Sequence, residues 1–254
     1  IKTPNIDKLA KQGMKFTQHY SGSAVCAPSR STFIEGKHTG HSYVRGNINN
    51  GKKGRMRGNH PIPNTRTLGD MFKEQGYSTA AIGKWGLGGM VGTGHPNDHG
   101  FDLFYGYLDQ IHAHNYYPTY LVKNRNFVEL NNPQIYKRNN VSAEEINNPV
   151  SYSAYQGNDF SGDLMADEAI NFINTNAKAK KPFFLYFPTP IPHVALQLPA
   201  QALAKYEGAF EEIPYSGNKG YFPHQTPRAA YAGMVTLLDD YVGRILAALE
   251  KNGI

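Results

Sequence analysis

The sequence predicts an α/β protein in which a mostly parallel sheet carries helices on both faces. Two short apolar runs, residues 77–82 and 182–187, have the length and composition of buried strands. Helical patterns precede and follow them, and this alternation is typical of α/β domains. A chain of 254 residues is long enough for one large domain, which we expect over residues 1–254.

The first expected element is a helix that begins at Thr3-Pro4 and ends at Gly13. Three apolar residues would form its buried stripe: Ile6, Leu9 and Ala10. An apolar strand is expected next, over residues 14–17. This strand should deliver the loop that follows it to an edge of the sheet.

That loop leads to the most distinctive stretch of the chain, residues 25–36. Proline is tolerated in the first turn of a helix, so Pro28 should open a helix with Cys26 at its mouth and Arg30 one turn along. Free backbone N–H groups at a helix start favour anions, and the guanidinium of Arg30 suits a tetrahedral oxyanion. An anion site around Cys26 is therefore expected, with a buried structural cysteine as the simpler alternative.

A second helix and strand come next. Thr67 should cap a helix that Gly76 ends, and residues 77–82 should form a buried strand. The glycine-rich turn at 83–89 follows, where a backbone can approach closely. Lys84 should therefore lie at the carboxyl end of a strand, where ligands bind in open α/β sheets.

The middle of the chain carries two histidines and many asparagines. His112 and His114 could ligate a metal, but alternate residues of an extended segment face opposite sides, so one should point inward; we prefer His114. Residues 124–158 lack periodicity and predict a long irregular insertion, about 119–160, rather than sheet or core. A specificity loop and a surface loop without function are both compatible with that pattern.

The last third predicts a helix over 163–177, a buried central strand over 182–187 and His193 after it. A final helix should run from Thr226-Pro227 to Gly253. Its apolar face comprises Tyr231, Met234, Val235, Leu238, Val242, Ile245 and Leu249. Asp239 and Asp240 fall inside this helix, where neighbours diverge by about 100°. They therefore predict a solvated or salt-bridged face rather than a metal site.

The formal charge of +6 favours anionic partners. Much of it lies in one Gly/Asn-rich loop, as Arg45, Lys52, Lys53, Arg55, Arg57 and Arg66. The loop could face solvent or a substrate, but it lacks the interleaved aromatic residues of a nucleic-acid platform, so no nucleic-acid partner is expected. No apolar run approaches the length of a membrane span.

Two motifs resemble those of type I sulfatases, the formylglycine-dependent, arylsulfatase-like enzymes of the alkaline phosphatase superfamily. The first is Cys-Ala-Pro-Ser-Arg at 26–30, followed by Gly36; the second is Gly-Lys-Trp-Gly-Leu-Gly at 83–88. The resemblance covers nearly the whole chain apart from the asparagine-rich segment. Two residues depart from the family pattern: Gly86 replaces a histidine that many sulfatases have, and Glu35 replaces a small hydroxyl residue.

The resemblance implies a sulfatase-like fold and hydrolysis of sulfate esters. A maturation enzyme would convert Cys26 to formylglycine, which provides the nucleophile and one metal ligand. Arg30 and Lys84 would neutralise the sulfate, and His193 would protonate the leaving oxygen. His114 would orient the sulfate, so that Lys84, His114 and His193 all bind substrate. Tyrosine-rich loops and the basic rim favour sulfated carbohydrates such as polysaccharides as substrates.

The family also implies a divalent cation, usually Ca²⁺, held by oxygen ligands. Apart from position 26, those ligands should lie outside residues 1–254, so we expect a segment that lacks both ends, binds calcium poorly and is inactive in isolation. The family further implies a periplasmic or secreted location. The alternatives are a phosphonate or phosphate monoester hydrolase of the same superfamily, and a non-catalytic glycan- or anion-binding protein that keeps Cys26 as a thiol.

Overall fold

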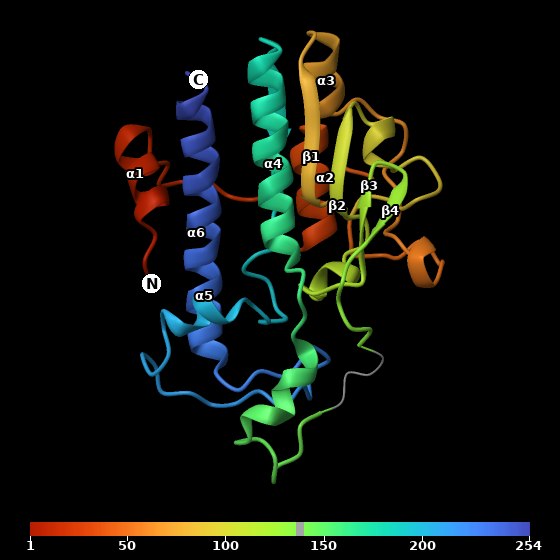
Figure 1. Cartoon of the computed structure of the whole chain (residues 1–254). Helices are drawn as coiled ribbons and strands as arrows, with labels where there is room; N and C mark the ends of the chain where they lie inside the picture. The colour runs from red at the N-terminus through yellow and green to blue at the C-terminus, as the bar shows by residue number, and fades with distance from the viewer. Residues whose placement is uncertain (136–139) are drawn as a thin grey trace.

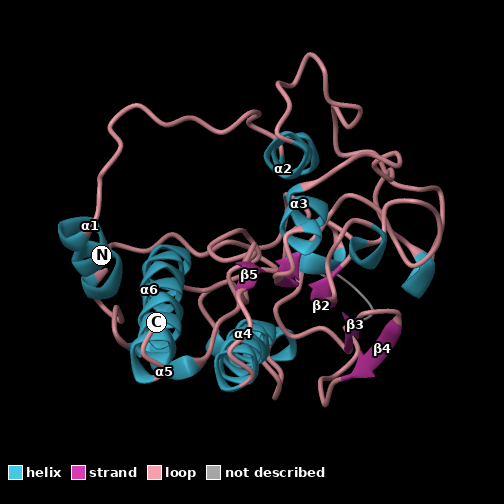
Figure 2. Ribbon diagram, turned by 90° about the horizontal axis from the view of Figure 1, so that it is seen from above, coloured by secondary structure: helices cyan, strands magenta, loops and turns pink. Residues whose placement is uncertain are grey.

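Helices lie on both sides of a central sheet (Figures 1 and 2). The computed structural model describes residues 1–135 and 140–254. One side of the sheet carries α2 (Cys26–Glu35) and α3 (Leu68–Glu74). The other carries α4 (Ser161–Lys178), with the remaining helices beside it: α6 (Pro227–Lys251), α1 (Pro4–Gln12) and α5 (Ala200–Ala204).

The sheet has five strands in the order β4-β3-β2-β1-β5. Three of them run parallel, with β1 between its partners: β1 (Ser78–Lys84), β2 (Leu103–Tyr107) and β5 (Phe183–Tyr186). The hairpin of β3 (Tyr120–Lys123) and β4 (Asn126–Glu129) adds to β2 in the antiparallel direction. The predicted α/β fold with helices on both faces is confirmed, with a mixed sheet.

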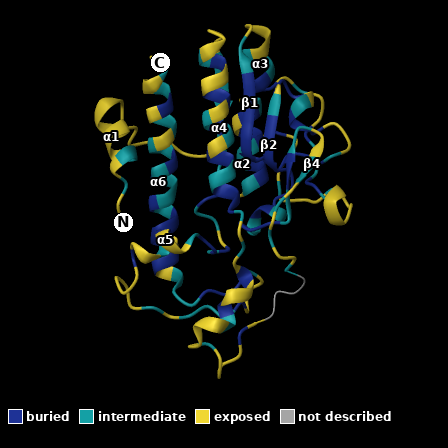
Figure 3. Ribbon diagram, in the orientation of Figure 1, coloured by how far each residue is buried: buried dark blue, intermediate teal, exposed yellow. Residues whose placement is uncertain are grey.

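Two apolar layers hold the helices to the sheet. Trp85, Phe101 and Phe104 are buried between the sheet and α2. On the opposite side Tyr107 and Met165 belong to the layer beneath α4. Figure 3 shows this buried interior against a largely exposed α1. None of the helices in the described part of the chain has both the length and the apolar character that a membrane crossing requires.

Local signals predicted the helix boundaries well. Thr67 and Asp70 form a reciprocal capping box at the start of α3, in which each side chain accepts a hydrogen bond from the other's backbone N–H. Pro227 occupies the first turn of α6, where its missing N–H costs nothing. Among residues 1–135 and 140–254 there are also four short 3₁₀ helices: Gly54–Met56, Pro96–Asp98, His112–His114 and Pro149–Tyr155.

Three strand predictions need correction. Residues 14–17 form no strand; Met14 and Phe16 are 78% and 70% exposed, because this connection between α1 and α2 runs away from the sheet. β5 is an edge strand rather than a central one, pairs with β1 and is half-buried. Within the stretch 119–160, expected to be irregular, 120–123 and 126–129 form β3 and β4, because they pair in a hairpin, and Tyr155 is buried in an apolar cluster. Whether the segment is an insertion stays a prediction.

Polar contacts, rather than the predicted apolar stripe, hold α1. No residue of α1 is buried, and Leu9 is largely exposed. On α6, Tyr231 also faces solvent, although the predicted face is otherwise buried or half-buried. The link between the two helices is Asp239, whose carboxylate accepts hydrogen bonds from the backbone N–H groups of Asn5 (3.1 Å) and Ile6 (2.7 Å).

Asp239 thus acts as a cap for α1 supplied by another helix. It also accepts a bond from Nδ2 of Asn5 at 2.8 Å and is completely buried. Its position at the positive end of the α1 dipole is favourable for a carboxylate. The expectation of a solvated or salt-bridged face is therefore wrong for Asp239 but correct for Asp240, which pairs with Lys205 at 2.8 Å.

These adjacent carboxylates give a matched test of the α1 attachment. Asp239→Asn should lower the free energy of unfolding by about 2–4 kcal/mol, because an amide donor would face the N–H donors of α1 in a buried site. Asp240→Asn, on the exposed side, should change it by no more than about 0.5 kcal/mol. Urea denaturation of the two variants measures both values, and equal effects would contradict the capping role.

Candidate active site

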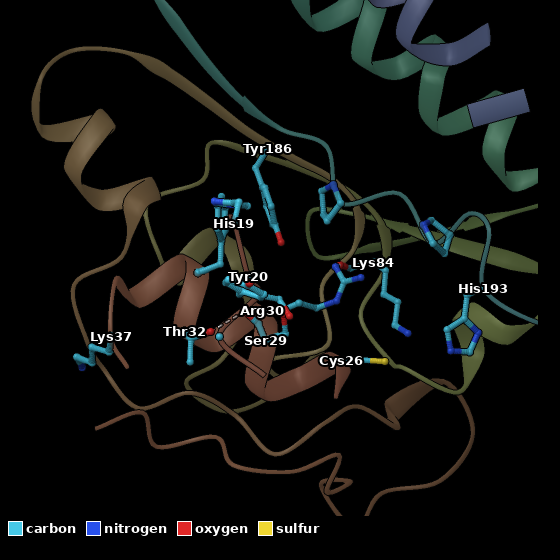
Figure 4. Close-up of a pocket in the computed structure, with 15 residues that line it drawn as sticks. His19, Tyr20, Cys26, Ser29, Arg30, Thr32, Lys37, Lys84, Tyr186 and His193 are labelled. Carbon is cyan, nitrogen blue, oxygen red and sulfur yellow. Dashed lines mark hydrogen bonds between the residues drawn. The ribbon is translucent and has the colours of Figure 1, made fainter. Parts of the chain in front are cut away.

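A cavity of about 640 Å³ opens where β1 and β5 end. Four chain segments line it: residues 19–22, α2, the end of β1 and the loop after β5. Figure 4 shows Lys84 and His193 pointing toward Cys26 within it. The structure therefore brings Lys84 and His193, which lie far along the sequence, to Cys26 and Arg30 of α2.

Cys26 is the first residue of α2, so the helix begins two residues before the predicted start at Pro28. Proline still fits, because the N–H groups of the first turn have no intrahelical partner. The backbone N–H of Ala27 donates instead to Oδ1 of Asn47 at 2.9 Å. Gly36 ends the helix in the left-handed conformation, with φ of 62°.

The surroundings of Cys26 favour its thiolate. A hydrogen bond with His193 is the main cause that lowers the pKa of Cys26, and it acts against burial, which raises the pKa. The positive charge of Lys84 and a hydrogen bond with Asn47 lower it further, to about 6. The thiol is therefore largely ionised at neutral pH, in a site that stabilises negative charge.

Lys84 is a buried cation at the end of β1, only 1% exposed. Its backbone N–H donates to the carbonyl of Pro188 at 2.9 Å, which ties β1 to the loop that carries His193. Gly83 makes this approach possible: its φ is 141°, and a Cβ there would lie 2.5 Å from the Pro188 oxygen. Burial lowers the pKa of Lys84 to about 8, and the charge of Arg30 lowers it too, while Cys26 opposes the shift.

Arg30 projects from α2 toward the end of β1. Its Nη1 donates to the carbonyl oxygen of Lys84 at 2.5 Å, and its guanidinium also bonds with Tyr186. The buried Nε has no hydrogen-bond partner among the described residues. One side of the guanidinium is therefore anchored to the protein, and Arg30 lines the cavity.

His193 follows β5, as the sequence predicts. Its Nδ1 lies in hydrogen-bonding contact with the carbonyl oxygen of Val194. A carbonyl can only accept, so Nδ1 carries a proton; to donate to the Cys26 thiolate, Nε2 must carry one as well, which makes the ring an imidazolium. The hydroxyl of Tyr116 donates to the His193 carbonyl at 2.8 Å and holds this loop in place.

The two candidate histidines of the middle segment point to different surroundings. They belong to a 3₁₀ helix rather than an extended segment, because Asp109 accepts bonds from the start of the turn. The His114 ring stacks on His193, with centroids 4.5 Å apart. His112 contacts Tyr107 and Tyr120 instead, and burial lowers its pKa to about 4. His114 is thus adjacent to the cavity without lining it.

Several residues around the site were not predicted. Asn47 and residues 19–22 reach it through long loops that carry no local signal. Tyr186 ends β5 and could have been found by the same strand-end argument as Lys84. At Gly86, where φ is 74°, a Cβ would lie 1.9 Å from Nε2 of Gln110, so the Gln110 amide fills the space of a side chain at position 86.

The basic loop does not face the cavity. Arg55 pairs with Glu129, and Arg57 pairs with Asp109 at 3.3 Å. Two further arginines of the loop are also engaged, Arg45 with backbone carbonyls and Arg66 with Glu74. None of the six basic residues of this loop lines the cavity, so the structure favours the solvated alternative.

Glu35 is accommodated by polar neighbours at the end of α2. Its side chain is buried and contacts the hydroxyl of Ser31, and Lys37 pairs with it at 3.0 Å. Ser42 bonds to Ser31 at 2.7 Å and completes the cluster. These partners offset the cost of a carboxylate in the place of a small hydroxyl residue.

The residues around Cys26 do not fit a calcium ion. Calcium prefers carboxylate and carbonyl oxygens, whereas the ionisable groups lining the cavity are the cations Arg30, Lys37 and Lys84 with two histidines, two tyrosines and the cysteine. In the described ranges, no group of three or more His, Cys, Asp and Glu residues could hold a metal ion.

The Cys26 environment predicts a specific pH profile. Only the thiolate reacts with iodoacetamide, so alkylation of Cys26 should rise with pH and reach half its maximum near pH 6, rather than near 9.0. His193→Gln removes the hydrogen bond that is the main cause of the lowered Cys26 pKa, so it should raise the midpoint by ~1–2 pH units. Mass spectrometry of the Cys26 peptide measures the rate, with exposed His41→Gln as control. A midpoint near 9 in the unaltered protein would contradict the geometry.

Known proteins resemble this chain over its whole length. The family model described as Sulfatase matches residues 1–254. Mouse arylsulfatase J is 30% identical over the whole chain, which covers 36% of that protein, and rat N-acetylgalactosamine-6-sulfatase is 28% identical over the whole chain, which covers 43% of it.

A solved structure shares the fold. The crystal structure of Ps i-CgsB in complex with k-i-k-neocarrahexaose superposes with a TM-score of 0.73 at 26% identity, covering 99% of this chain and 50% of that one. The chain thus spans less than half the length of these curated relatives and half of the solved structure. Because the family match extends over every residue, the chain belongs to the sulfatase family.

Proposed function

We propose that the full protein hydrolyses sulfate esters in the Cys26 cavity, and that sulfated carbohydrates are its substrates. The observation that carries this proposal is the meeting of four residues from three separate segments in one cavity of a sulfatase-family chain: Cys26, Arg30, Lys84 and His193. The cavity combines a nucleophile position with two cations and a group that can move a proton.

The cations are suited to bind the sulfate group. Arg30 offers planar donors and Lys84 a buried ammonium, at the positive end of the α2 dipole. Their positions are fixed before substrate arrives, by the bond from Arg30 to the Lys84 carbonyl and by the burial of Lys84. Such fixed charges stabilise the negative charge that shifts within the sulfate group in the transition state.

Position 26 would hold a formylglycine made from the cysteine by a maturation enzyme. This group, once formed, supplies a hydrate oxygen as the nucleophile, which is the chemistry the Cys-Ala-Pro-Ser-Arg motif implies. His193 carries a proton on one ring nitrogen and presents the other toward position 26. In its protonated form it would deliver a proton to the oxygen of the leaving alcohol, while stacking on His114 keeps its ring in place.

The cavity walls support a carbohydrate substrate. Tyr20, Phe33 and Tyr186 line the cavity, and Phe33 stacks on Tyr186 with centroids 5.5 Å apart. The apolar faces of sugar rings pack on such aromatic walls. The solved relative was crystallised with a neocarrahexaose. A substrate of that class is consistent with a periplasmic or secreted protein, which is part of this proposal.

Hydrolysis of sulfate esters by the full protein should depend on Lys84. Lys84→Met should lower kcat/KM for a sulfate ester by about 10²–10³, because a fixed cation at the reacting group is lost. Lys73→Met removes a lysine that pairs with Asp102 outside the cavity and should leave kcat/KM within about twofold. Steady-state kinetics on a chromogenic aryl sulfate measure both variants, and equal losses would count against this role of Lys84.

Two further measurements separate the alternatives. Paired sulfate and phosphate monoesters with the same alcohol should show a preference for sulfate; a preference for phosphate would favour a phosphohydrolase. The Cys26 peptide, from a host that converts sulfatase cysteines, should show formylglycine by mass spectrometry. A thiol that persists, together with no ester hydrolysis, would favour a non-catalytic anion-binding protein.

A further inference from the structure

His193 belongs to a cluster of three rings. Its imidazole lies nearly parallel to that of His114, with 8° between the planes and 4.5 Å between the centroids. Tyr221 approaches both rings with its plane steeply inclined, at 5.4 Å and 60° to His114 and at 6.1 Å and 66° to His193. Tyr221 therefore contacts the whole stacked pair, although it comes from a distant loop.

That loop is a small hairpin over residues 215–224. Its ends are joined by two backbone bonds between Tyr215 and His224, at 2.9 and 3.0 Å. Tyr221 and Phe222 lie in its second half and belong to a small apolar cluster. Because Ala195 of the His193 loop belongs to the same cluster, the hairpin packs directly against the segment that carries His193.

The asparagine-rich segment 124–158 holds the hairpin in this place. Ile135 and Tyr155 supply the rest of the apolar cluster, and the Tyr155 ring lies 5.3 Å from that of Phe222. The backbone N–H of Val141 donates to the Ser216 carbonyl at 2.9 Å. These contacts connect an otherwise peripheral segment to the hairpin, and through Tyr221 to the histidine pair.

The other contacts of His193 do not fix the rotation of its ring, so this restriction is left for Tyr221. Tyr116 fixes the backbone of the residue, and the Val194 carbonyl binds Nδ1 at the ring edge. An imidazole can still turn about its side-chain bonds to another rotamer, because its terminal torsion is broad. Rings packed against it restrict that turn, and inclined aromatic contacts are favourable in themselves.

We propose that Tyr221 is a positioning residue, whose ring holds the stacked pair of His114 and His193 so that His193 faces Cys26. The asparagine-rich segment thereby supports the active site through the 215–224 hairpin. The inference deepens the proposed function, since His193 is the proton donor there. Its test uses the thiol of Cys26 alone and needs no turnover.

The test measures alkylation of Cys26 by iodoacetamide against pH, in the full protein produced with an unconverted cysteine. Tyr221→Leu should move the midpoint up by about 1 pH unit, because His193 loses its fixed contact with the thiolate. Tyr221→Phe keeps the ring and should leave the midpoint unchanged. The other groups that surround the thiol are the same in every variant: Lys84, Asn47 and Arg30.

A double variant shows whether Tyr221 acts through His193. In a His193→Gln background, Tyr221→Leu should cause no further shift, since the contact it supports is already gone. Tyr231→Leu, at an exposed tyrosine of α6, should have no effect in either background. A shift of the same size with and without His193 would overturn the proposal.

A second variant tests the same contact if Tyr221→Leu fails to fold. His114→Leu removes the other ring of the stack and should raise the midpoint in the same direction and by a similar amount. Thermal unfolding identifies the variants that remain folded. An unshifted midpoint in a folded Tyr221→Leu or His114→Leu variant would overturn the proposal, whereas absence of sulfate ester hydrolysis would count against the proposed function only.

Discussion

The buried ammonium of Lys84 is the constraint on which the site depends. A charge removed from water is costly unless nearby groups compensate it. At the end of β1 the compensation comes from Cys26, whose thiolate Lys84 favours, and from the carboxylate of Asp109. Lys84 and Arg30 both line the cavity, so their positive charges attract an anion there.

The fold creates this environment by bringing chain segments unusually close. A side chain at position 83 would collide with the Pro188 carbonyl, so the glycine there allows β1 and the loop after β5 to meet. Arg30 joins the same point through the Lys84 carbonyl. Three segments separated by more than fifty residues are thereby fixed to one another through backbone groups. The side chains they carry keep their relative positions without direct contact between all of them.

Much of the site could be predicted because its main residues belong to short motifs. Cys26 and Arg30 share one helix, Lys84 ends a recognisable apolar strand, and His193 follows another. The parallel arrangement of β1 and β5 then brings those strand ends to one edge of the sheet. The helix boundaries could be predicted equally well, because a capping residue such as Thr67 bonds to a residue only a few positions away.

What could not be predicted depends on contacts between distant residues. The partner of Asp239 lies 234 residues away, so no local pattern distinguishes it from the exposed Asp240. The edge position of β5 depends on which strands pair, and its apolar sequence does not encode that. Tyr221 contacts the histidine pair from a hairpin that packs on a separate segment.

The most direct test of the account is a crystal structure of the full protein, as the Cys26→Ser variant, with a bound carbohydrate sulfate ester. The account predicts the sulfate group between Arg30 and Lys84, with the ester oxygen directed toward His193 and the sugar against the aromatic wall that includes Tyr186. A sulfate group bound outside this cavity, or one that contacts neither Arg30 nor Lys84, would contradict it.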